Sequence, residues 1–172
     1  MLRLLGGSMI VTGCLGLGVW YRQQFILRLK VIRIMVEILE ILMSEIGYGK
    51  ATLPECCRRV ADRQAEPYRT GLLHIYTKMQ ENEGIGFSET FCTCMEEVLK
   101  EQPVTAEDKE HFLAFAKGEG FEDGRMQLRT IERSRELLLK TAGGLEKENV
   151  EKCRLAVGLG AMSGLLLILI LL

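Results

Sequence analysis

The two ends of the chain are free of charged side chains over long stretches, and this feature limits the possible folds most. Residues 4–20 read LLGGSMIVTGCLGLGVW, and residues 155–172 close with LLLILILL. At a helical rise of about 1.5 Å per residue, each segment spans roughly 26 Å, just short of the roughly 30 Å hydrocarbon core of a bilayer. We therefore expect two membrane-spanning helices. A buried core helix is the alternative for either segment.

The first segment also has some features of a cleaved signal peptide. Residues 11–14 read VTGC, which has the look of a lipoprotein cleavage box. Too little apolar sequence precedes Cys14, however, and the apolar run continues past it to Trp20. We favour an uncleaved membrane anchor.

The middle of the chain has the composition of a soluble domain. Apart from Arg3, every charged residue lies between Arg22 and Arg154, although the whole chain is 48% hydrophobic and has a net charge of −1. This balance excludes a disordered tail and a strongly basic nucleic-acid binder. We predict three parts: an N-terminal transmembrane anchor (residues 1–21), a cytoplasmic helical bundle (22–154) and a C-terminal transmembrane helix (155–172).

The charges that flank the apolar segments predict the orientation in the cell membrane. Basic residues gather on the inner side of both segments: Arg22, Arg28, Lys30, Arg33, Lys147, Lys152 and Arg154. Only Arg3 and the terminal amine lie on the other side. The positive-inside rule then places the central domain in the cytoplasm and both termini outside.

The stretch 22–46 has the pattern of a central bundle helix. It contains no Pro or Gly, and its polar side chains recur at helical spacing: Lys30, Arg33, Glu37, Glu40 and Ser44. A single narrow polar stripe on an otherwise apolar helix predicts burial of the remaining faces. We expect this helix to continue straight from the first membrane segment and to end at Gly47–Gly49.

Capping and breaking residues divide the rest of the domain into shorter helices. Thr52 with Glu55, and Thr105 with Asp108, have the spacing of a capping box, and Ser88 is a further N-cap candidate. Further helices are predicted over about residues 53–64, 67–82, 88–100, 105–117 and from 122 onward. No segment alternates as a strand does. The expected fold is all-α, a cytoplasmic bundle of about six helices flanked by two terminal transmembrane helices.

The residue types that carry chemistry do not form a recognisable site. The four cysteines outside the membrane segments are Cys56, Cys57, Cys92 and Cys94, and neither pair has the spacing of a zinc knuckle. His74 and His111 have no Ser or Cys partner at a catalytic spacing. We therefore expect no enzyme activity, no catalytic residue, no cofactor and no metal.

Three stretches of the chain resemble the stage III sporulation protein AB family of endospore-forming bacteria. They are the opening MLRLLG of residues 1–6, EIGYG at 45–49 followed by TLPE at 52–55, and DKE at 108–110 leading through Phe115, Gly118, Gly120 and Asp123 to Gln127 and Ile131. The match covers essentially the whole chain, and Glu119 departs from the apolar residue expected before the second glycine. The family is similar to the inner-membrane platform protein of type II secretion and type IV pilus machines.

The resemblance implies a type II secretion F-like bundle that docks a cytoplasmic ATPase of the stage III sporulation protein AA type. It also implies other subunits of the same membrane complex, membrane lipid as surroundings, and a role in the channel joining mother cell to forespore. We expect docking through a polar surface, with Arg58, Arg59 and Arg63 as candidates for partner binding. Acidic residues later in the chain form the fallback surface: Glu96, Glu97, Glu101, Glu107, Asp108 and Glu110.

A second hypothesis is a membrane-bound thiol or metal sensor that uses Cys56, Cys57, Cys92 and Cys94. Replacing all four with Ser and assaying spore formation separates the two hypotheses, because only the sensor needs sulfur.

Overall fold

A computed structural model gives the fold. It describes residues 2–48, 51–81, 86–117 and 126–148, with side chains from residue 23 onward. The chain divides into two units, Lys30–Ala142 and the combination of Met1–Leu29 with Gly143–Leu172. The account below concerns mainly the first of these, Lys30–Ala142.

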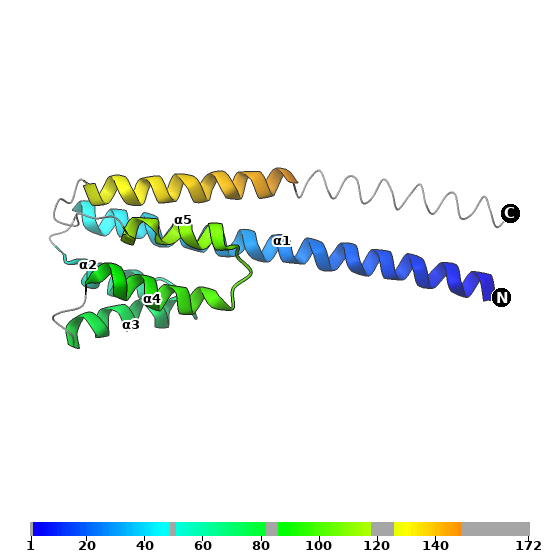
Figure 1. The fold of residues 1–172 in the computed structure, drawn as a ribbon, viewed down its shortest axis with the longest axis horizontal. Helices are drawn as coiled ribbons and strands as arrows, with labels where there is room; N and C mark the ends of the chain where they lie inside the picture. The colour runs from blue at the N-terminus through cyan, green and yellow to red at the C-terminus, as the bar shows by residue number, and fades with distance from the viewer. Residues whose placement is uncertain (1, 49–50, 82–85, 118–125, 149–172) are drawn as a thin grey trace. The chain divides into compact units, whose positions relative to one another are not determined.

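The described residues are helical and contain no β-strand, so the predicted all-α class is confirmed (Figure 1). The helices are α1 (Leu2–Tyr48), α2 (Leu53–Ala61), α3 (Tyr68–Glu81), α4 (Phe87–Lys100), α5 (Ala106–Lys117) and a further helix over residues 126–148. The glycines expected to break the chain after Lys117 lie in 118–125, outside the described residues.

None of the helices in the described part of the chain has the length and apolarity needed to cross a bilayer. Of the two predicted membrane segments, residues 155–172 lie outside the described residues, and residues 4–20 belong to α1, where the structure describes the backbone.

Helix α1 supplies one side of the core of Lys30–Ala142, as its sequence pattern predicts. All five residues of the predicted polar stripe are exposed, whereas Ile32, Met35 and Leu39 have no exposed surface. The helix ends at Tyr48, inside the Gly-Tyr-Gly sequence expected to stop it. Glu40 on α1 pairs with Arg135 on helix 126–148, with 2.7 Å between Oε1 and Nε. The apolar faces of α1 are therefore buried, and its polar stripe includes an ion pair to a distant segment.

Helices α2 to α5 pack in chain order, α2 on α3, α3 on α4 and α4 on α5 (Figure 1). The α3–α4 contact requires a glycine, because a Cβ on Gly71 would collide with Cγ2 of Val98. The α4–α5 contact is aromatic. The rings of Phe91, Phe112 and Phe115 are buried, and the Phe91 and Phe115 rings meet edge to face at 4.9 Å between centroids.

The capping predictions have mixed outcomes. At α5 the capping box is confirmed, because the Asp108 N–H donates to Thr105 Oγ1 and the Thr105 N–H donates to Asp108 Oδ2. At α4 the predicted N-cap is wrong, because the helix begins at Phe87 with Gly86 as N-cap. The longer helix allows the Phe87 ring to lie near that of Phe91, 5.5 Å away and one helical turn on.

The capping box predicted at the start of α2 is also wrong. Thr52 occupies the N-cap position but makes no side-chain capping bond, and the Glu55 carboxylate, the other half of the box, is bound by Arg58. The helix ends at Ala61, three residues earlier than predicted. There the N–H of Arg63 donates to Val60 O and that of Gln64 to Ala61 O, bonds of the tighter i to i+3 kind that commonly close a helix.

Candidate docking surface

The three arginines predicted for partner binding lie together at α2. Arg58 and Arg59 are in its last turn, and Arg63 follows two residues after its end. All three guanidinium groups reach water, with exposed side-chain fractions of 43%, 48% and 63%. The three residues therefore lie close together and accessible at α2, and their role in partner binding stays a prediction.

Two carboxylates hold the arginines in place. Glu55, one turn earlier on α2, accepts two hydrogen bonds from Arg58, at 2.7 Å and 3.2 Å. Glu45, at the end of α1, accepts a 2.9 Å bond from Arg59 and lies 3.9 Å from Arg63. This ionic network ties α2 to α1. We call it the arginine network and define it as Glu45, Glu55, Arg58, Arg59 and Arg63.

The electrostatics of the network follow from these contacts. The hydrogen bond from Arg58 lowers the pKa of Glu55, with smaller contributions from the charges of Arg58 and Arg59. The same bond raises the pKa of Arg58, and the bond from Arg59 to Glu45 raises the pKa of Arg59. The Arg58 guanidinium also lies 5.9 Å from the ring centre of Tyr76 on α3, within cation–π range. The contacts thus favour the charged forms of Glu55, Arg58 and Arg59.

Sequence reasoning found the arginines but missed the carboxylates that orient them. The link from Glu55 to Arg58 and Arg59 is readable from its spacings of three and four residues on a helix. The link from Glu45 to Arg59 was not readable, because it depends on how α1 and α2 pack. Tyr48, which is 97% exposed, was also overlooked as a surface residue.

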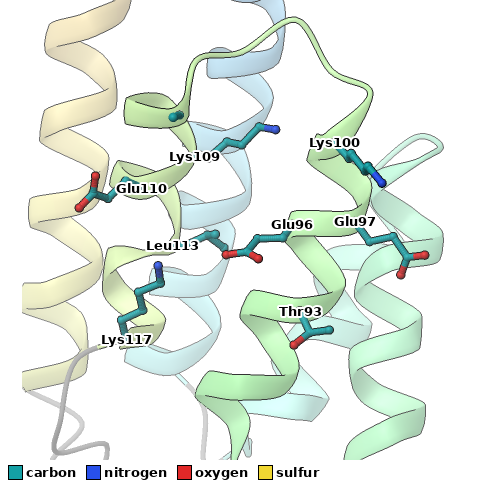
Figure 2. Close-up of a pocket in the computed structure, with 9 residues that line it drawn as sticks. Thr93, Glu96, Glu97, Lys100, Lys109, Glu110, Leu113 and Lys117 are labelled. Carbon is teal, nitrogen blue, oxygen red and sulfur yellow. The ribbon is translucent and has the colours of Figure 1, made fainter.

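The fallback acidic surface is less acidic than the sequence suggested. Helices α4 and α5 line an open groove of about 680 Å³, into which both lysines and glutamates project (Figure 2). Its charged lining residues are Glu96, Glu97, Lys100, Lys109, Glu110 and Lys117. Asp108 is fully buried and caps α5, so it does not belong to this surface. The groove has no excess of either charge.

The cysteines proposed for a sensor lie on two helices. Cys56 and Cys57 are buried on α2, and Cys94 is buried on α4 close to the half-buried Cys92. Burial raises the pKa of all four thiols, which lowers the thiolate fraction that oxidation or metal binding requires. Within the described residues, no three His, Cys, Asp or Glu side chains cluster closely enough to hold a metal ion.

Comparisons with known proteins point to one family. The sequence model of the family described as Stage III sporulation protein AB matches residues 3–172. A solved structure named Stage III sporulation protein AB (SpoIIIAB) has the same fold, with a TM-score of 0.64 and 18% sequence identity. The match covers 72% of this chain and 97% of that one. No curated protein gives a significant match.

Proposed function

Since the chain belongs to the stage III sporulation protein AB family, we propose that it acts in sporulation as a membrane-anchored docking component of a secretion-like complex. In this role it recruits a cytoplasmic ATPase to the membrane between mother cell and forespore. The role is structural, and the chain itself carries out no catalysis. The observation that carries the proposal is the arginine network, a set of three accessible guanidinium groups on a helical bundle, of which those of Arg58 and Arg59 are oriented by hydrogen bonds to carboxylates.

The network suits docking because its arginines are held without being covered. Arginine presents a planar fork of donors that binds carboxylates in two-point contacts. Glu45 and Glu55 fix Arg58 and Arg59 in place, so less side-chain freedom is lost when a partner binds. Exposed charges of this kind accelerate encounter, and their effect weakens as salt rises.

The membrane part of the proposal rests on the sequence. Residues 4–20 and 155–172 anchor the chain, and the basic residues beside them keep Lys30–Ala142 in the cytoplasm. A reporter that is active only outside the membrane, fused at Gly84–Gly86, should stay silent in cells. Reporter activity there would overturn the topology.

Recruitment is tested with the full chain in neutral phosphatidylcholine vesicles and the purified ATPase. The ATPase should float with vesicles that contain the chain and remain at the bottom with empty vesicles. Replacing Arg58, Arg59 and Arg63 with Gln should reduce the floated fraction severalfold. We choose Gln over Glu because three new carboxylates would face Glu45 and Glu55 and disturb the fold.

A matched control separates docking from the integrity of the network. The double variant Glu45→Gln and Glu55→Gln breaks the same ion pairs but keeps all three arginines. It should recruit the ATPase somewhat less well than the unmodified chain, because Arg58 and Arg59 lose their orientation, but clearly better than the variant that lacks the arginines. Equal loss of recruitment in both variants would mean that the network matters only for the fold, and no flotation with the unmodified chain would refute the proposal itself.

A further inference from the structure

Tyr48 is exposed to a degree that sets it apart from the other large apolar side chains. It is 97% exposed at the end of α1, whereas the other large exposed apolar residues with described side chains are between 43% and 55% exposed. Its hydroxyl has no hydrogen-bond partner among the described residues. A single exposed aromatic ring is ordinary on a protein surface, so its neighbours decide whether it has a role.

Arg63 is the least satisfied member of the arginine network. Its side chain is 63% exposed, and its one contact with a carboxylate is the 3.9 Å approach to Glu45, too long for a hydrogen bond. Within the part of the chain that the structure describes, its guanidinium donates no hydrogen bond. Five N–H donors are therefore available to a carboxylate from outside.

Tyr48 and Arg63 are neighbours of the same residue. Tyr48 follows Glu45 by three positions on α1, which places their Cβ atoms about 5–6 Å apart on one helix face. Glu45 in turn lies 3.9 Å from the Arg63 guanidinium. An exposed aromatic ring and an unsatisfied guanidinium thus have Glu45 as a common neighbour, and Tyr and Arg are among the residue types that most often dominate binding energy at interfaces.

We propose that Tyr48 and Arg63 together form the anchor that binds an acidic segment of the cytoplasmic ATPase. This inference rests on the proposed function and names the chemistry of its contact. A partner carboxylate forms a two-point contact with Arg63 at a shorter distance than Glu45 offers. An apolar side chain beside that carboxylate packs on the Tyr48 ring. Tyr48 and Arg63 therefore require a partner segment that has both a carboxylate and a neighbouring apolar side chain.

The position of the pair favours a protein over a lipid headgroup. Tyr48 lies about 27 Å along α1 from Lys30, where the unit begins. The membrane segment expected at residues 4–20 precedes Lys30 in the chain. Along the chain, the anchor therefore lies at the end of α1 that is farther from the expected membrane segment.

The test uses the same vesicles and measures the apparent affinity of the ATPase for four single variants of the full chain. Tyr48→Ala and Arg63→Gln should each weaken binding by about tenfold or more. Two controls change matched exposed residues elsewhere: Leu139→Ala, which is 43% exposed, and Arg69→Gln on α3, also exposed. Both controls should bind as the unmodified chain does, and circular dichroism should show equal helix content in all variants.

Each outcome of these affinity measurements supports or refutes the anchor. If the ATPase binds the unmodified chain, and Tyr48→Ala or Arg63→Gln binds it equally well, the anchor is refuted while the proposed function stands. If the controls lose as much affinity as the two test variants, the contact is not specific and the anchor is also refuted. If the ATPase does not bind the unmodified chain, the anchor and the proposed function fail together.

Discussion

Two helix contacts in Lys30–Ala142 are built from opposite chemistry. Helices α4 and α5 meet through the buried rings of Phe91, Phe112 and Phe115, whereas α1 and α2 are linked by the exposed ion pair between Glu45 and Arg59. Buried aromatic area contributes several kcal/mol per side chain, while exposed ion pairs contribute little. We infer that the aromatic contact between α4 and α5 contributes the stability, and that the ionic contact between α1 and α2 is available to bind a partner.

The aromatic contact should be the more damaging one to disturb. We expect Phe91→Ala to lower the free energy of unfolding by about 3–5 kcal/mol, because the ring is fully buried and borders both aromatic residues of α5. Chemical denaturation of the full chain in detergent measures this loss. A loss below about 1 kcal/mol would mean that the aromatic cluster does not hold α4 to α5.

The close approach of α3 to α4 should respond next most strongly. Gly71→Ala places a methyl group against Val98, and we expect a cost of about 1–3 kcal/mol from overpacking. Gly143→Ala is the matched control, because it is also in a helix and its Cβ would meet nothing within 4 Å. It should stabilise the chain by up to about 1 kcal/mol. Thermal unfolding measures both effects. If the two substitutions change the melting temperature in the same direction, the packing described for Gly71 is contradicted.

The arginine network should give the smallest change in stability, and a change that depends on pH. The pKa of Glu55 is lowered from its ordinary value of 4.5, so its contribution is complete above that value and is lost as pH falls through the lowered one. The difference in stability between the unmodified chain and Glu55→Gln should therefore shrink below about pH 4.5. Melting temperatures of both proteins from pH 7 to pH 3 measure it, and a difference that grows at low pH would contradict this sign.

The sequence predicted those features that depend on neighbours along the chain. The stripe from Lys30 to Ser44 is exposed as its spacing requires, and Thr105 and Asp108 cap α5 as predicted. The prediction failed where one side chain has two possible hydrogen-bond partners nearby in the chain. Glu55 suits a capping box with Thr52, but it binds Arg58 three residues later, because a charged donor makes the stronger hydrogen bond.

Contacts between distant residues were beyond such reasoning. Arg135 pairs with Glu40, 95 residues away, and Arg59 pairs with Glu45 on another helix. Both pairs depend on how the helices pack, which the residue pattern of each helix alone does not encode. The candidate site was therefore predicted as three arginines, while its carboxylates and the neighbouring Tyr48 came from the structure.

The central claim is that the ionic contact between α1 and α2 faces a partner, whereas the aromatic contact between α4 and α5 holds the fold. Hydrogen–deuterium exchange of the full chain in vesicles, with and without the ATPase, tests it most directly. Protection gained on binding should fall on the end of α1 around Tyr48 and on α2 through Arg63. Protection confined to the groove between α4 and α5, or no change anywhere, would contradict the claim.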